Sequence, residues 1–162
     1  MTAGAISGNP ELTVMNTAAV VVIGAGVQGL SVAYHLAKAG VSKVTVVEKE
    51  RIGAGSSGRS ASMLTLQRET RPKINLSLYS YQRFMDFAQE FGVDPQFKKI
   101  GFLSLVPENK IVPSLQRAAL RNEMGVRTEV LLPAQINELI PIVNTSDIKL
   151  GIFGSDDGVI DA

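Results

Sequence analysis

A glycine-rich turn that follows an apolar run constrains this chain most. Residues 18–23 are rich in β-branched side chains, as in a parallel strand buried on both faces. They lead into the spacing G-x-G-x-x-G, formed by Gly24, Gly26 and Gly29. The first glycine permits a tight turn, the second lets the backbone approach a pyrophosphate, and the third lets a helix pack closely on the sheet. The phosphates are expected at the N-terminus of that helix, where free N–H groups and the helix dipole favour negative charge.

The residues after the glycines complete the pattern of a β-strand, a helix and a second strand. Residues 28–39 carry apolar side chains at helical spacing, and Gly40 is placed to end that helix. Residues 44–47 are a second β-branched run, and Glu48 follows at the position that binds ribose hydroxyls. An acid there would repel a 2′-phosphate. The sequence therefore predicts a site for FAD or NAD rather than NADP.

Composition excludes several classes of function. The 162 residues have the length of one ordinary domain, and a net charge of +1 without a basic stripe predicts no nucleic-acid surface. The absence of cysteine, with a single histidine, predicts no metal site and excludes disulfides. Residues 18–37 are apolar, but their glycines argue against a transmembrane segment. Residues 1–17 lack the basic start of a signal peptide, so a cytoplasmic location is expected.

A second segment rich in glycine and serine covers residues 52–64. Small residues let a backbone approach a ligand, and successive N–H and hydroxyl groups can hold phosphate or carbonyl oxygens. Ser56 or Ser57 is placed to cap a short helix. The alternative interpretation is a flexible surface linker. Beyond it, an amphipathic helix is predicted at 72–91, with its apolar stripe in the core. Further strands and helices are predicted at 101–106, 114–124, 126–132, 134–139 and 150–153.

Together these features resemble the FAD-dependent oxidoreductases of the D-amino-acid oxidase, glycine oxidase and sarcosine oxidase type. The resemblance covers residues 19–162 and has four landmarks in family order. The glycine motif with Glu48 comes first, and residues 55–60 are similar to the family's second flavin-contacting stretch. A strand opening Gly-Phe-Leu at residue 101 follows, and the "DG-x-ID" turn at 157–161 comes last.

The resemblance implies an α/β fold, with a Rossmann-like FAD-binding βαβ unit followed by an α+β segment of a substrate domain. It divides the chain into a lead-in (1–17), the βαβ unit with the second flavin-contacting segment (18–71), a partial substrate or cap domain (72–155), and the start of a return to the FAD domain (156–162). Family members are more than twice this length, so the fold is expected to be incomplete. Two strands and one helix cannot bury an independent core.

The resemblance also assigns residues to the cofactor. The three glycines, with Val27 and Gln28, would hold the pyrophosphate; Glu48 would hold the ribose, and Lys49 would lie near the adenosine end. The segment toward the flavin ring would contain Ser56, Ser57, Arg59, Ser60, Ala61 and Met63. The flavin is expected to be non-covalent, because this segment has serines where some members have a flavin-linked histidine. No catalytic acid or base is assigned. Arg59, Arg68 and Arg71 are candidate cations for a substrate carboxylate, and a solvated or ion-paired role at a helix start is the favoured alternative.

The function expected from this resemblance is oxidation of a C–N bond in a small amine or amino acid, by hydride transfer to FAD. The chain is expected to be inactive alone, with a partner subunit as one source of a missing C-terminal half. An NAD-dependent dehydrogenase is the competing enzyme class, and the glycine-serine segment favours flavin over it. The non-enzyme alternative is a nucleotide-binding subunit or inactive remnant that works through a partner.

Overall fold

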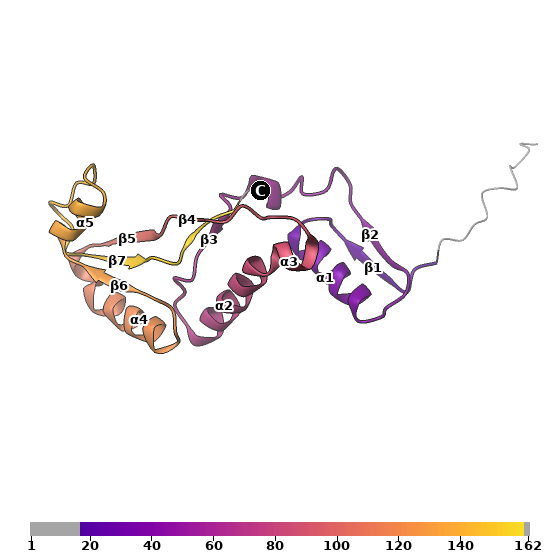
Figure 1. Ribbon diagram of the computed structural model, residues 1–162, viewed down its shortest axis with the longest axis horizontal. Coiled ribbons are helices and arrows are strands. Elements are labelled where there is room, and N and C mark those ends of the chain that lie inside the picture. The colour runs from indigo at the N-terminus through magenta and orange to yellow at the C-terminus, as the bar shows by residue number, and fades with distance from the viewer. Residues whose placement is uncertain (1–16, 161–162) are drawn as a thin grey trace, which may run out of the picture. The chain divides into compact units, whose positions relative to one another are not determined.

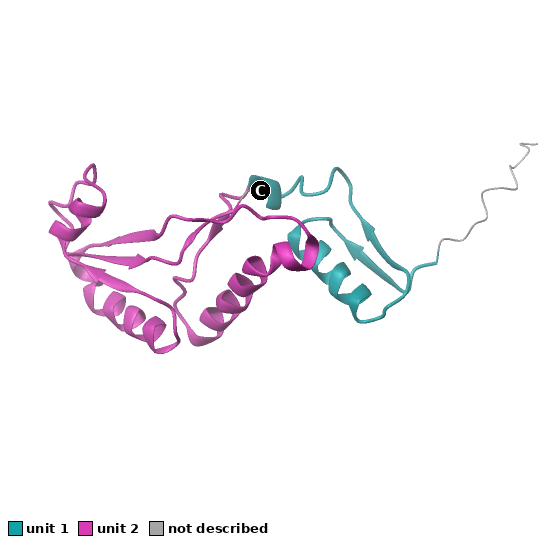
Figure 2. Ribbon diagram, viewed as in Figure 1, with its two compact units in different colours: residues 1–59 teal, residues 60–162 magenta. Residues whose placement is uncertain are grey.

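A computed structural model describes residues 17–160. The predicted lead-in therefore lies outside the described residues except for Thr17, as do the last two residues of the predicted return segment. The chain divides into two compact units, Met1–Arg59 and Ser60–Ala162 (Figure 2). The domain division predicted from the sequence is a functional one, and it stays a prediction.

The first unit contains the predicted βαβ arrangement. Strand β1 (Val20–Ile23) leads into helix α1 (Val27–Lys38), and strand β2 (Val44–Val47) follows (Figure 1). The two strands pair in parallel, with Val20 opposite Val44 and Ile23 opposite Val47. A 3₁₀ turn, η2 (Ser57–Arg59), closes the unit. The mixed α/β class predicted from the sequence is confirmed.

Within this unit only one face of the sheet is covered. Side chains alternate along β1 between half-buried and exposed, and a Cβ added to Gly29 on α1 would lie 3.4 Å from Val22. Val22 therefore faces the helix, whereas Val21 is 55% exposed and Ile23 is 87% exposed. The prediction that this strand is buried on both faces is wrong among residues 17–59, because α1, the one α-helix in this range, covers only one side of the sheet.

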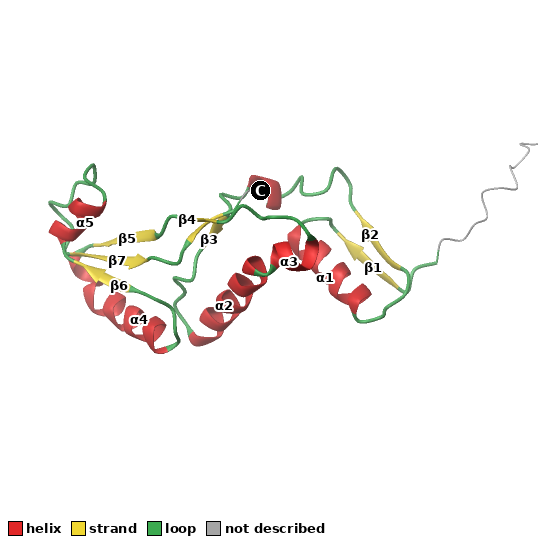
Figure 3. Ribbon diagram, in the orientation of Figure 1, coloured by secondary structure: helices red, strands yellow, loops and turns green. Residues whose placement is uncertain are grey.

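The second unit contains two antiparallel sheets (Figure 3). The first has the order β3-β8-β4, made of Met63–Leu64, Gly158–Val159 and Lys98–Lys99. The second has the order β5-β7-β6, made of Phe102–Val106, Leu150–Gly154 and Glu129–Leu131. Strands β3 and β4 were not predicted, because a two-residue strand is too short to show an alternating pattern.

The helices of the second unit differ from the predictions mainly at their ends. The single helix predicted at 72–91 is wrong: α2 (Arg71–Met85) and α3 (Phe87–Phe91) are separated at Asp86, whose ψ of −3° departs from helical geometry. Gly92 ends α3 as predicted, with φ +68°. A 3₁₀ turn, η3 (Glu108–Lys110), precedes α4 (Ile111–Glu123), and α5 (Pro133–Leu139) follows β6.

Two clusters form the core of the second unit. One joins Ile74 of α2 to Leu66 and Val126, with Leu78 and Tyr81 packed against them, which confirms the core role of the α2 stripe at these positions. The other packs Ala118 of α4 against the β5-β7-β6 sheet. Among residues 17–160, no helix combines the length and apolarity that a membrane crossing requires.

Candidate functional site

The turn between β1 and α1 requires glycine at two positions. Gly24 has φ +98°, in the left-handed region that other residues rarely adopt. A Cβ on Gly29 would lie 2.0 Å from the carbonyl oxygen of Gly24, which is closer than any real contact. The first turn of α1 therefore packs directly on the end of β1. These two glycines produce the tight strand-to-helix turn that the spacing predicted.

Glu48 holds this turn from the end of β2. Its Oε2 accepts a hydrogen bond from the N–H of Ala25 at 2.8 Å, and its Oε1 accepts one from the N–H of Glu50 at 3.1 Å. Hydrogen bonds from these two N–H groups, Ala25 first, lower the pKa of Glu48 below its ordinary 4.5. The carboxylate is therefore ionised at neutral pH and oriented at the edge of the glycine turn.

The second glycine-serine segment contacts the glycine turn directly. The N–H of Val27 donates to Ser57 Oγ at 2.9 Å, and the N–H of Gly53 donates to the carbonyl of Ala25 at 3.0 Å. A Cβ on Gly26 would lie 3.1 Å from Ser57 Oγ, so a glycine at this position leaves room for the hydroxyl. The flexible-linker interpretation is thus wrong for residues 53–57, which form part of the same surface as the glycine turn.

The N-terminus of α1 fits the diphosphate of a dinucleotide. Gly26 is the N-cap and supplies no side-chain acceptor, and the first intrahelical bond runs from the N–H of Leu30 to Gly26. The N–H groups of Gln28 and Gly29 therefore have no acceptor within the helix. No acidic residue lies in this first turn. Donor groups, helix dipole and close backbone approach together suit an anionic ligand.

The other predicted cofactor residues stay predictions, and Lys49 and Ser56 among them are exposed in the first unit. The Lys49 side chain is 86% exposed and lies 3.6 Å from Glu50. Ser56 is exposed, and its carbonyl accepts the N–H of Arg59. The remaining three belong to the second unit, and their roles stay predictions: Ser60, Ala61 and Met63.

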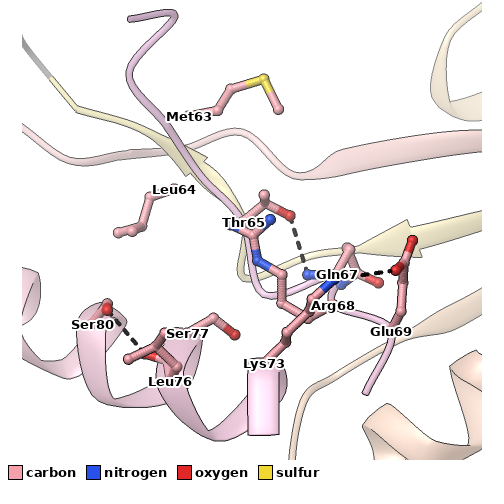
Figure 4. Close-up of a pocket in the computed structure, with 10 residues that line it drawn as sticks. All are labelled: Met63, Leu64, Thr65, Gln67, Arg68, Glu69, Lys73, Leu76, Ser77 and Ser80. Atoms are coloured by element: carbon pink, nitrogen blue, oxygen red, sulfur yellow. Dashed lines mark hydrogen bonds and ion pairs between the residues drawn. The ribbon is translucent and has the colours of Figure 1, made fainter. Parts of the chain in front are cut away.

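A cavity of about 420 Å³ lies in the second unit, between helix α2 and the stretch formed by β3 and the segment that follows it (Figure 4). Its lining is mixed: the apolar side chains are Met63, Leu64 and Leu76, and the polar ones are Thr65, Gln67, Arg68, Glu69, Lys73, Ser77 and Ser80. Lys73 lies 3.7 Å from Glu69, whereas Arg68 has no ion-pair partner among the described residues. Five guanidinium donors therefore remain for water or a ligand. The sequence suggested Arg68 as a candidate cation but not the cavity around it.

Two buried charged side chains near this cavity were missed at the sequence level. Asp157 is 1% exposed and Arg121 is 7% exposed. Both hydrogen-bond to the segment after β3, through Leu66 and Arg68 respectively. The only sequence signal was the Asp-Gly turn at 157–158, which does not indicate which segment it contacts. No group of three or more metal-binding side chains occurs among residues 17–160.

The parallel βαβ unit, its glycine turn and the acid after β2 define a dinucleotide-binding α/β protein. The comparisons with known proteins identify its family: residues 19–162 match the family described as FAD dependent oxidoreductase. The chain belongs to this family. The sequence-based expectation of an FAD-dependent amine or amino-acid oxidoreductase family is thereby confirmed.

Relatives include enzymes and a regulatory protein. The chain is 33% identical over 86% of its length to 4-methylaminobutanoate oxidase (formaldehyde-forming) of Paenarthrobacter nicotinovorans, and 31% identical over 88% to the mitochondrial pyruvate dehydrogenase phosphatase regulatory subunit of Mus musculus. Among solved structures, L-proline dehydrogenase from P. horikoshii superposes with a TM-score of 0.78 at 30% identity over 89% of this chain. The chain spans 17%, 16% and 38% of these proteins, respectively.

Proposed function

We propose that this chain forms the FAD-binding N-terminal portion of a flavoenzyme that oxidises a C–N bond in an amine or amino acid. The observation that carries the proposal is the glycine turn bound from two sides, by Glu48 through Ala25 and by Ser57 through Val27. The family match supports the flavin, and the names of two relatives, an oxidase of 4-methylaminobutanoate and an L-proline dehydrogenase, support the substrate class.

Each group of cofactor-binding residues contacts a different part of FAD. The N–H groups of Gln28 and Gly29, at the start of α1, bind the pyrophosphate, and the N–H of Val27 holds the Ser57 hydroxyl beside them. Glu48 accepts hydrogen bonds from the adenosine ribose, whose hydroxyls compete with or join the N–H of Ala25. Lys49 lies toward the adenosine, and the segment toward the flavin ring comprises Ser56, Ser57, Arg59, Ser60, Ala61 and Met63. The flavin is held without a covalent link.

The cavity of the second unit is the proposed site for the substrate. FAD, when bound, supplies the hydride acceptor for the carbon next to the amine nitrogen. The chain's own contribution is recognition: the unpaired guanidinium of Arg68 binds a carboxylate, and the hydroxyls of Ser77 and Ser80 line the opposite wall on α2. No acid or base for proton transfer is assigned among the described residues.

The second candidate function is a nucleotide-binding subunit that works through a partner without catalysis. The observation that favours it is the relative named as a regulatory subunit, which matches 88% of this chain. An NAD-dependent dehydrogenase is less well supported, because the family match is to flavoproteins. The proposal includes a partner subunit and a cytoplasmic location. The regulatory relative, by contrast, is named as a mitochondrial protein.

The experiment that tests the proposal is co-elution of flavin with the purified full chain. The chain is mixed with excess FAD, and separately with NAD, and each mixture is passed through gel filtration. The proposal predicts flavin absorption bands in the protein fraction and no retained NAD. Retention of NAD but not FAD would contradict it. FAD retention together with oxidation of L-proline or sarcosine would exclude the regulatory alternative.

A further inference from the structure

Asp157 connects two segments of the second unit that are far apart in the sequence. It lies in the turn between β7 and β8 and is 1% exposed. Its Oδ1 accepts the N–H of Leu66 at 2.8 Å, and its Oδ2 accepts the hydroxyl of Thr65 at 3.1 Å. A Cβ on Gly154 would lie 2.5 Å from this Oδ2, so the approach depends on a glycine three residues earlier. One carboxylate therefore holds two consecutive residues of the segment after β3.

The Asp157 side chain accepts hydrogen bonds but forms no ion pair with a described residue. Its neighbour Asp156 pairs with Lys99 and Arg127, whereas Asp157 makes no ion pair with any described residue. The groups next to it are donors: the Leu66 N–H, the Thr65 hydroxyl and the Gln67 side-chain amide. Arg121 interacts with it electrostatically without forming an ion pair. A buried carboxylate without a paired cation is costly unless its hydrogen bonds are satisfied. An amide in its place would turn an N–H group toward one of these donors.

The same segment is held from a second direction by Arg121 of α4. Its Nε donates to the carbonyl of Arg68 at 2.7 Å, and the side chain is 7% exposed. The backbone from Thr65 to Arg68 is thus fixed by two buried charged groups, one on each side of Gln67. Thr65, Gln67 and Arg68 are also three of the polar residues that line the cavity. Fixing this backbone fixes the polar wall of the cavity.

We propose that Asp157 is a positioning residue, whose buried carboxylate sets the geometry of residues 65–68 and thereby the polar wall of the cavity. Its importance for catalysis rests on the proposed function, since only then does the cavity receive a substrate. Its effect on the wall does not depend on flavin or substrate. A structural residue would stabilise the whole second unit, whereas a positioning residue acts locally, and this difference can be measured.

The test is amide hydrogen exchange in the full chain, compared between wild type, Asp157→Asn and the matched control Asp156→Asn. We expect exchange at Leu66 and Gln67 to accelerate at least about tenfold in D157N, while amides of β5 and β7 stay within about twofold. D156N should leave both regions unchanged, because Asp156 bonds only to surface cations.

Three outcomes would overturn the proposal: unchanged exchange at residues 65–68 in D157N, equal acceleration throughout the second unit, or loss of its fold. Thr65→Val provides an independent check, because it removes the hydroxyl that donates to Oδ2 and accepts the N–H of Gln67. It should accelerate the Leu66 amide by about threefold and leave β7 unaffected; no change at Leu66 would also count against the proposal. FAD retention, measured on the same samples, reports on the proposed function separately.

Discussion

The hydroxyl of Ser57 accepts a hydrogen bond from the backbone N–H of Val27, the first residue of α1, at 2.9 Å. This contact joins two segments that the sequence separates by thirty residues. It places a neutral, movable acceptor at the helix terminus where we propose that the pyrophosphate binds. The hydroxyl can donate its own proton to a phosphate oxygen while it accepts the N–H of Val27. Ser57 is therefore expected to serve cofactor binding as well as the shape of the turn.

Replacement of Ser57 by alanine should weaken FAD binding by about tenfold, equivalent to about 1.4 kcal/mol. Ser42→Ala is the matched control: Ser42 is exposed and precedes β2, at the end of the strand away from the glycine turn. Titration of flavin fluorescence with each purified variant measures the two affinities. Ser57→Thr keeps the hydroxyl and should recover most of the loss. Equal affinities for S57A and S42A would show that the Ser57 contact has no part in binding.

Glu48 should make the first unit sensitive to acid. Its folded-state pKa lies below its ordinary 4.5, mainly because of the hydrogen bond from Ala25. A lowered pKa stabilises the folded unit above pH 4.5, and this contribution is lost as the pH falls through the folded-state pKa. In wild type, we expect FAD affinity to decline over the same pH range. In Glu48→Gln, FAD affinity should not change over this range and should be about tenfold weaker than wild type at neutral pH. Glu50→Gln serves as the control, and a decline of equal size in E48Q would exclude Glu48 as its source.

Asp157 should give the local stability of residues 65–68 the opposite dependence on pH. Burial raises its pKa above the ordinary 3.8, despite hydrogen bonds from Leu66 and Thr65. The packed segment then holds the proton more tightly than the opened segment does. This contribution is complete below pH 3.8 and is lost as the pH rises through the folded-state pKa. The protection of the Leu66 amide against hydrogen exchange, measured between about pH 3 and 6 relative to Asp157→Asn, should fall over this range. A ratio of the two protections that does not change with pH would contradict it.

Arg68 should bind the carboxylate of a ligand in the cavity. The probe is sarcosine, added to the full chain while backbone amide shifts are recorded by NMR. We expect shifts at residues 65–68 and in the first half of α2, and Arg68→Gln should weaken the interaction about tenfold or more. Arg71→Gln is the matched control, since Arg71 is already paired with Glu123 at 2.7 Å. If R68Q and R71Q bind sarcosine equally, the anchor is not Arg68.

The sequence predicted the parts of this structure that depend on local pattern. Strand β2 has the predicted bounds, because its β-branched run is short and well marked. Helix α1 begins and ends one residue earlier than predicted, because apolar side chains at helical spacing and Gly40 indicate its position. The break at Asp86 was not predicted, since the apolar stripe continues on both sides of it and only the backbone changes. The two-residue strands β3 and β4 both form by pairing with β8, and their own residues contain no pattern that predicts this partner.

The candidate site likewise contains residues that a local pattern predicts and residues that depend on long-range contacts. The glycines and Glu48 were predicted because the turn itself demands those residue types at that spacing. The contact of Ser57 with Val27 and that of Asp157 with Leu66 cross 30 and 91 residues, respectively. Such pairs depend on how the chain returns to itself, which a single sequence does not encode in any local pattern. The cavity arises for the same reason from α2 packing beside the segment after β3.

The most direct test of FAD binding at the glycine turn compares two glycine-to-alanine variants. In Gly29→Ala the new Cβ would lie 2.0 Å from the carbonyl of Gly24, whereas at Gly55 it would meet no atom within 4 Å. Flavin fluorescence titration of the full chain should show loss of FAD binding by at least about a hundredfold in G29A and a change within about twofold in G55A. FAD affinity that is equal in G29A and G55A would contradict a flavin site at this turn.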